Sequence, residues 1–195
     1  MERRAAFEAL YARIRKDPAY RSKAMGTVFV PGAGDPEAGV VFVGEAPGRD
    51  EERLGAPFVG AAGRNLTALL EGAGLTREGV FITNLVKYRP LTTTHGNRRP
   101  TPAEARRALP YLLEELAILA PRLVVCLGAA AAEALLARRP LRMAEANGGV
   151  FSAAGLRLLV TYHPSPFNWL SPEKRRAMRE AFERIREYAA GAGHG

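Results

Sequence analysis

The chain is poor in cysteine and in long apolar segments. Its 195 residues include a single cysteine, Cys126, which excludes an internal disulfide and a cysteine cluster for zinc or iron–sulfur. Cys126 lies inside the apolar run 123–127, where a small buried hydrophobic residue is expected in preference to a nucleophile. No apolar run approaches the roughly 20 residues of a membrane span, and residues 1–4 lead into an amphipathic pattern instead of a signal-peptide core. We therefore expect a cytoplasmic protein with no metal and no membrane partner.

Positive charge, in contrast, is in excess. The chain has 28 Lys and Arg residues against 20 Asp and Glu, for a formal net charge of +8. Such an excess favours a polyanionic partner, because it raises encounter rates and supplies non-specific affinity for phosphates. Arginine is also a good helix former, so charge alone leaves proteins that bind no nucleic acid equally open. The length suits one domain over residues 1–195.

Apolar runs and amphipathic stretches alternate along the chain. Short runs rich in β-branched residues predict strands at about 40–43, 80–83, 122–127 and 156–162. Helical spacing and capping signals predict helices at about 2–16, 62–73, 102–119 and 172–188, with an alanine-rich helix that ends near 138. This alternation predicts an α/β fold in which helices cover both faces of a parallel sheet.

Each of these strands ends at a residue of interest: Glu45, Asn84, Gly128 and His163. In an open parallel sheet, ligands bind outside the carboxyl ends of the strands. A carboxylate, an amide and an imidazole are therefore expected on one edge. Each also has a structural interpretation, as a solvated turn carboxylate, a turn-forming Asn and a packed His.

The turns around these residues indicate what they can bind. Residues 44–48, Gly-Glu-Ala-Pro-Gly, can present backbone N–H groups to an anion or a polarised carbonyl. No Gly-Lys-Ser/Thr follows, which disfavours a nucleoside triphosphate site. The Asn84 amide offers a donor and an acceptor side by side, which suits the N–H/C=O edge of a pyrimidine. Pro164 holds His163 extended, pointing off its strand end.

Aromatic and basic side chains flank the predicted edge. Phe58 lies between two turns and either fills the core or stacks on a planar ligand. Phe167 and Trp169 lie on a predicted loop and either pack on the last helix or form a wedge that enters a base stack. The loop after the second strand carries four basic residues, interpreted either as a solvated face or as phosphate contacts: Lys87, Arg89, Arg98 and Arg99.

Several short motifs match one family in order and spacing. They are Gly-Asp-Pro at 34–36, Val-Gly-Glu-Ala-Pro-Gly at 43–48, Pro-Phe-Val-Gly at 57–60, Ile-Thr-Asn at 82–84, Lys-Tyr-Arg-Pro at 87–90, Arg-Pro-Thr-Pro-Ala-Glu at 99–104, Pro-Tyr-Leu at 110–112 and His-Pro-Ser at 163–165. On these motifs the chain resembles the uracil-DNA glycosylase superfamily, and in particular its bacterial and archaeal family-four enzymes. The resemblance implies a three-layer α/β/α sandwich with a central four-stranded parallel sheet. It also implies hydrolysis of the N-glycosidic bond of uracil in DNA, on a nucleotide flipped out of the stack.

The resemblance also implies residue roles. Phe58 would stack on the flipped base, Asn84 would read its polar edge, and His163 would donate to uracil O2 as charge develops on the leaving base. Glu45 would orient the base and the attacking water, and Glu51 lies where similar enzymes carry acidic residues that affect activity. The remaining assignments are substrate contacts at Gly44 and Ala46, and DNA contacts at Gly48, Arg49, Lys87, His95, Arg98, Ser165 and Phe167.

Two departures from the family pattern affect the expected chemistry. Ala46 stands where the best-known uracil glycosylases have a water-activating Asp, so catalysis is expected to depend more on leaving-group stabilisation. Family-four enzymes usually hold a four-iron cluster with four cysteines, whose positions correspond here to Tyr88, to about Ala108, and to the neighbourhood of Asp17 and Tyr20. None is cysteine, so we predict no iron–sulfur cluster and no other cofactor.

Alternative functions differ in the base or in the outcome. The enzyme could excise hypoxanthine or another deaminated purine, although the Asn84 amide favours uracil. It could bind a damaged base without cleaving it. The loop 91–96 is longer than is usual in the family and bears His95. In this it resembles a related group of enzymes in which a histidine on an extended loop captures the sugar covalently. The residues beside His95 do not match that group. We expect a monomer acting on DNA that contains uracil or another deaminated base.

Overall fold

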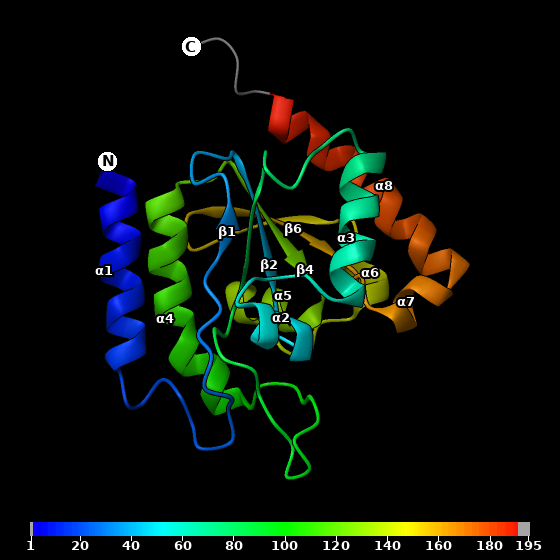
Figure 1. Cartoon of the computed structure of the whole chain (residues 1–195). Helices are drawn as coiled ribbons and strands as arrows, with labels where there is room; N and C mark the ends of the chain where they lie inside the picture. Colours follow the sequence, from blue (N-terminus) through cyan, green and yellow to red (C-terminus); the bar gives the residue numbers. More distant parts are fainter. Residues whose placement is uncertain (1, 191–195) are drawn as a thin grey trace.

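The computed structural model describes residues 2–190 and places a six-stranded sheet at the centre of the fold (Figure 1). The strands, in the spatial order β1-β3-β2-β4-β6-β5, are β1 (Ala33–Gly34), β2 (Val40–Gly44), β3 (Phe81–Asn84), β4 (Leu123–Leu127), β5 (Val150–Ala153) and β6 (Leu156–Thr161). The helices are α1 (Glu2–Lys16), α2 (Arg49–Leu54), α3 (Ala61–Gly72), α4 (Pro102–Leu119), α5 (Ala129–Leu136), α6 (Met143–Ala146), α7 (Pro166–Leu170) and α8 (Pro172–Ala190).

The predicted α/β/α architecture is confirmed, and the strand count is corrected. β3, β2, β4 and β6 are parallel, as expected. One antiparallel strand is added at each edge: β1 pairs with β3, and β5 pairs with β6. Three short helices, α2, α6 and α7, were also not predicted, and Phe167 and Trp169 lie in α7 rather than in a loop. Among residues 2–190, no helix is both long and apolar enough to cross a membrane.

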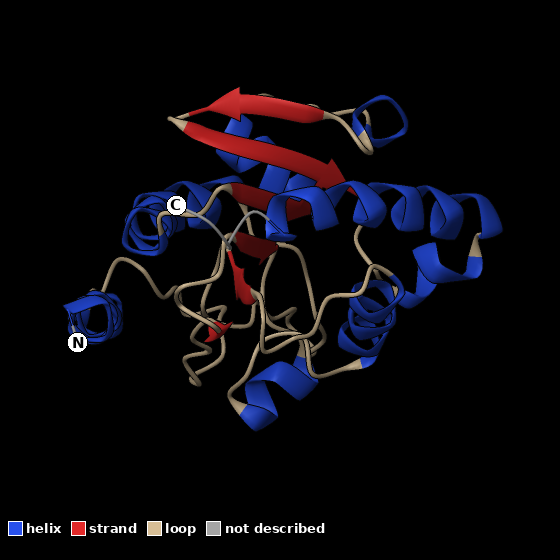
Figure 2. Cartoon of the chain, turned by 90° about the horizontal axis from the view of Figure 1, so that it is seen from above, coloured by secondary structure: helices blue, strands red, loops and turns tan. Residues whose placement is uncertain are grey.

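Alternating side chains along the strands fill two separate cores. Val41 and Val43 of β2 pack with residues of α1, α4 and α5, whereas Val40 and Phe42 pack with residues of α3 and α8. The alternation follows from the period of two along a strand. Figure 2 shows the resulting helical layers on the two sides of the sheet. Because both faces are covered, the carboxyl edge of the sheet is where a site can open.

The entry to α4 is fixed by the predicted capping box. Thr101 Oγ1 accepts a hydrogen bond from the Glu104 amide at 3.2 Å, and Glu104 Oε2 accepts one from the Thr101 amide at 2.8 Å. Burial alone would raise the pKa of the Glu104 carboxyl, but hydrogen bonds from Arg98, Thr101 and Ser22 lower its pKa to about 2. The Arg98 guanidinium donates to both Glu104 oxygens, at 2.7 and 2.8 Å. The loop before α4 is thereby tied to the helix.

Candidate active site

A cavity of about 460 Å³ opens at the carboxyl edge of the sheet. Its volume lies in the range of small-molecule sites. In the sheet, β3 lies on one side of β2, and β4, which follows β3 in the chain, lies on the other side. The cavity lies at this reversal of strand order, the place where open α/β sheets bind ligands. The residues assigned from the sequence that line it are Glu45, Ala46, Gly48, Arg49, Glu51, Phe58, Asn84, Arg98, His163 and Ser165. The expected convergence of β2, β3 and β6 on one edge is therefore confirmed.

Gly44 at the end of β2 lets an aromatic ring and an amide approach one point. A Cβ on Gly44 would overlap Asn84 Oδ1 and lie 2.6 Å from two carbons of the Phe58 ring. Phe58 itself has a positive φ of 53°. Its backbone lies against Gly63, where a Cβ would overlap the Phe58 carbonyl. Phe58 is 6% exposed and packs on the α3–α8 side of the core, which confirms the packing interpretation. It also lines the cavity, and stacking on a planar ligand stays a prediction.

The Asn84 side chain is buried at the floor of the cavity, with 3% of the residue exposed. Within the part of the chain that the structure describes, no side-chain hydrogen bond engages its amide, whereas its backbone carbonyl accepts one from Lys87 Nζ at 2.9 Å. An Asn serving only as a turn former would bond its own backbone. The donor and the acceptor of this amide are therefore available to a ligand.

His163 is held in place by the backbone of its turn. Asn168 Nδ2 donates to the His163 carbonyl, and Asn65 Nδ2 donates to the Pro164 carbonyl, both at 2.9 Å. The imidazole lies 5.8 Å from the Phe58 ring, centroid to centroid. Burial lowers the pKa of His163 to about 4, although the Glu51 carboxylate acts in the opposite direction. The imidazole is therefore neutral near pH 7 and has one N–H to donate.

Glu51 uses both carboxylate oxygens to hold two turns together. Oε1 accepts from the amides of Val59 and Gly60 at 2.9 and 2.8 Å, and Oε2 accepts from the Gly48 amide at 3.0 Å. These bonds join the turn after β2 to the turn that carries Phe58. The catalytic role expected for Glu51 stays a prediction, and its contacts favour positioning.

Glu45 is paired with an arginine that the sequence analysis did not assign to the site. Its carboxylate lies 3.0 Å from Arg99 Nε, and the two side chains are 25% and 67% exposed. Asp50 and Asn97 also line the cavity without having been assigned. Arg99 was noted as part of the basic loop, but no spacing in the sequence indicated that it would reach Glu45 across 54 positions.

Lys87 does not contact DNA in this fold, so that prediction is wrong. Its side chain is 1% exposed, and its ammonium lies 2.6 Å from Glu115 Oε2 of α4. Thr83 hydrogen-bonds to both partners, and Tyr11 donates to Glu115. Burial lowers the pKa of Lys87, and the charge of Glu115 opposes that shift. This buried ion pair lies directly beneath the end of β3 and supports Asn84.

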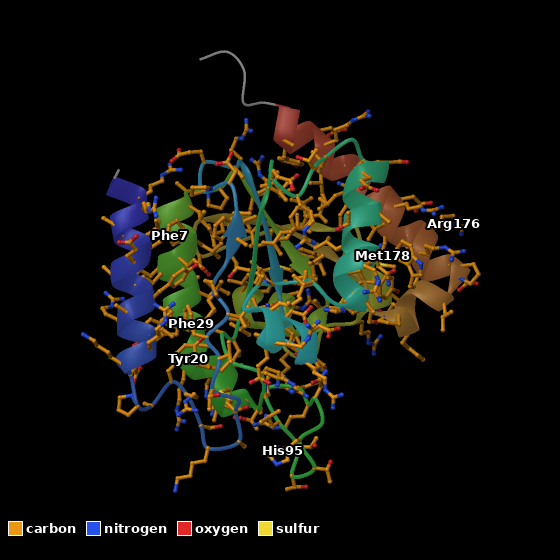
Figure 3. The ribbon with its side chains drawn as sticks, viewed as in Figure 1. Phe7, Tyr20, Phe29, His95, Arg176 and Met178 are labelled. Atoms are coloured by element: carbon orange, nitrogen blue, oxygen red, sulfur yellow. The ribbon has the colours of Figure 1, made fainter. Side chains whose placement is uncertain are left out.

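Two other residues assigned to DNA binding lie outside the cavity wall. His95 has a φ of 58° and lies at the tip of a loop that projects away from the sheet (Figure 3). The loop is anchored by Arg89, which donates to the His95 carbonyl at 3.0 Å and to Asn97 Oδ1 at 2.6 Å. Phe167 is 79% exposed on α7. Both side chains are accessible, and neither reaches the Asn84 floor.

The positions that correspond to the four cysteines do not fit an iron–sulfur cluster. Tyr20 is 2% exposed, and its ring lies 6.0 Å from that of Tyr88 and 5.4 Å from that of Tyr111. The Tyr20 hydroxyl accepts a hydrogen bond from the Lys87 amide at 3.1 Å. Asp17 accepts one from the Tyr111 hydroxyl at 2.8 Å. Edge-packed phenol rings offer no thiolates, the ligands that such clusters require.

Comparisons with known proteins identify the family of the chain. The model of the uracil DNA glycosylase superfamily matches residues 31–186. A type-4 uracil-DNA glycosylase from Archaeoglobus fulgidus is 39% identical over 168 residues, which cover 83% of this chain and 82% of the relative. One from Thermotoga maritima is 34% identical over 98% of both chains. A type-5 uracil-DNA glycosylase from Thermus thermophilus is 36% identical over 87% of this chain and 82% of the relative.

Proposed function

The chain belongs to the uracil DNA glycosylase superfamily, and from its site we infer that it hydrolyses the N-glycosidic bond of uracil in DNA and leaves an abasic site. The observation that carries this inference is the convergence of Phe58, Asn84 and His163 on one cavity at the sheet edge. A stacked base cannot reach such a cavity, so the target nucleotide must be flipped out of the strand.

The floor of the cavity recognises the base. Phe58 stacks on the flipped ring, and the free amide of Asn84 pairs with the N–H/C=O edge of uracil. A cytosine presents a different donor and acceptor pattern, which leaves the buried amide unpaired and costs affinity. Gly44 permits this arrangement, since any side chain there would displace both Phe58 and Asn84.

His163 stabilises the leaving group. As the bond between the sugar and the base breaks, negative charge develops on uracil O2, and the neutral imidazole donates its N–H to that oxygen. Glu45 orients the attacking water, and Glu51 acts as a positioning residue through its three backbone hydrogen bonds. With Ala46 beside Glu45, no second carboxylate follows directly to activate the water.

Basic and exposed residues on the rim hold the DNA. Arg49 and Arg99 line the mouth of the cavity, and the exposed Phe167, on α7, is proposed as a wedge. Arg98 also lines the cavity, but the structure contradicts its assignment to DNA binding, because Glu104 and the carbonyls of Ala24, Leu91 and Arg99 take up all five of its N–H groups. Backbone groups of Gly48 and the Ser165 turn lie on the same rim. We further propose that the chain acts as a monomeric single domain in the cytoplasm.

The test is single-turnover cleavage of oligonucleotides that contain uracil, hypoxanthine or xanthine, single-stranded and opposite each base. We expect an abasic product from uracil. An abasic product from a purine alone would move the specificity to another deaminated base. Tight binding without cleavage, or a protein–DNA adduct that survives denaturation, would contradict hydrolysis and favour a non-cleaving or covalently capturing binder.

A further inference from the structure

A second cavity, of about 450 Å³, adjoins the first at the same edge of the sheet. It lies between α4 and α5, which pack against each other, and it is closed at one end by the loop that precedes α4. Glu45 and Arg99 line both cavities, so their 3.0 Å ion pair forms the shared wall. None of the roles assigned to the first cavity uses this space.

The walls of the second cavity are apolar, and its mouth is basic. Leu85 and Leu109 lie on the walls with four alanines, Ala105, Ala130, Ala134 and Ala137. Arg99, Arg106 and Arg139 contribute positive charge. Arg139 lies 3.6 Å from Glu133 and Arg99 is paired with Glu45, whereas Arg106 has no carboxylate partner within residues 2–190. An uncharged flat group with an anion attached to it would match this distribution.

We propose that the second cavity takes an unpaired nucleobase from the nucleotide next to the uracil nucleotide on the same strand. Its apolar walls would cover the base, and Arg106 and Arg99 would contact the phosphates that link it to the flipped nucleotide. This inference rests on the proposed function, because it needs a strand whose uracil occupies the first cavity. The shared wall gives the strand a short path from one cavity to the other.

A second cavity that holds an unpaired base would favour single-stranded DNA. A base within a duplex is paired and stacked, so it would have to be extruded together with the uracil before it entered the second cavity. In single-stranded DNA that cost is much smaller. We therefore expect tighter binding of single-stranded than of double-stranded substrate.

The experiment removes the base and fills the cavity in one double-mutant cycle. Single-stranded oligonucleotides carry one uracil, and the neighbour on the 5′ or the 3′ side is either a normal nucleotide or a reduced abasic unit. The protein is wild type or Ala105→Trp, which fills the cavity from α4. Because the apolar walls would no longer cover a base, we expect its loss on one side to raise the half-saturating DNA concentration of wild type about tenfold. In Ala105→Trp, loss of the same base should change the half-saturating DNA concentration less than twofold. The rate of uracil release at saturating DNA should be unchanged in both proteins.

Two further variants keep the test decisive. Ala130→Trp fills the cavity from α5 and should behave as Ala105→Trp does. Arg106→Glu should weaken binding about tenfold, whereas Arg107→Glu, the same charge change on an exposed neighbour that does not line the cavity, should stay within about twofold of wild type. If both Trp variants fail to fold, the difference in DNA binding between Arg106→Glu and Arg107→Glu decides whether the second cavity takes part.

Two results would overturn the proposal: no effect of the missing base on either side in wild type, or an equal effect in wild type and the Trp variants. Failure of the proposed function is a separate outcome, in which wild type releases no uracil from any oligonucleotide. In that case the same cycle, measured as Kd by fluorescence anisotropy, still tests whether the second cavity holds a base.

Discussion

Two halves of the segment after β3 differ in almost every physical respect. Residues 85–90 are all buried, whereas residues 91–99 are partly or fully exposed. Lys87 is the most deeply buried basic residue of the first half and forms an ion pair with Glu115. Arg99, at the end of the second half, is 67% exposed. Two side chains of the same charge, twelve positions apart, therefore have different roles. The buried half holds Asn84, the residue proposed to read the base, and the exposed half presents charge to the solvent.

The first way to test this contrast is to remove the buried charge. Lys87→Met leaves Glu115 buried without its cation, which costs about 3–5 kcal/mol in the free energy of unfolding. Lys23→Met, at an exposed position, should change it by less than about 0.5 kcal/mol. Urea unfolding of the two variants measures both values. If Lys87→Met lowers the free energy of unfolding by less than about 1 kcal/mol, the Lys87–Glu115 ion pair does not support the cavity floor at Asn84.

The second test compares two histidines. His163→Ala should lower the single-turnover rate of uracil release by about 10²–10³-fold, because a preorganised donor to the leaving base is lost, while the Kd for DNA stays within about twofold. His95→Ala, on the exposed loop, should leave the rate within about twofold and affect binding alone. If His163→Ala binds DNA more weakly and releases uracil at an unchanged rate, His163 binds DNA and does not stabilise the leaving base.

The pH dependence sharpens the role of the buried histidine. Because burial lowers the pKa of His163 to about 4, the imidazole is already neutral as pH rises above about 5. The rate at saturating DNA should therefore not fall between about pH 5 and 8. The folded state should also lose stability as pH falls from about 6.5 towards 4, since only the unfolded chain takes up the proton in that window. A rate that declines with rising pH around a midpoint near 6.5 would require imidazolium as the donor.

The smallest effect is expected from the exposed half. Arg99→Gln removes one rim charge, so it should weaken DNA binding several-fold and reduce the slope of log K against log salt by about 0.7 for single strands. Arg4→Gln, on the exposed side of α1, is the matched control and should leave that slope unchanged. Equal slopes for wild type and Arg99→Gln would exclude a phosphate contact at Arg99.

The same contrast explains what could be predicted from the sequence. The four parallel strands and their functional ends were predictable, because apolar runs that stop at a turn place Glu45, Asn84 and His163 on one edge. The capping box at Thr101 was also predictable, because its two hydrogen bonds are local. Local pattern, however, gives no direction to a charged side chain in a loop, and Lys87 was therefore assigned to the wrong surface.

Other features that the sequence did not predict have similar physical causes. The hairpin of β5 and β6 turns at Ala154 and Gly155, both with positive φ, at 51° and 73°. Such a turn is usually recognised by Asn-Gly or Asp-Gly, and Ala-Gly carries no such signal. Asn65 and Asn168 hold the turn of His163, but their partners are backbone carbonyls, which no residue type marks in the sequence.

The most direct measurement compares uracil release by wild type and Asn84→Ala, with enzyme in excess over a single-stranded oligonucleotide and with Kd for uracil-free DNA determined alongside. We predict that wild type releases uracil and that Asn84→Ala does so about 100-fold more slowly, with the same Kd, because the buried floor no longer pairs with the base. Unchanged uracil release by Asn84→Ala would contradict the claim that the buried half of the site reads the base.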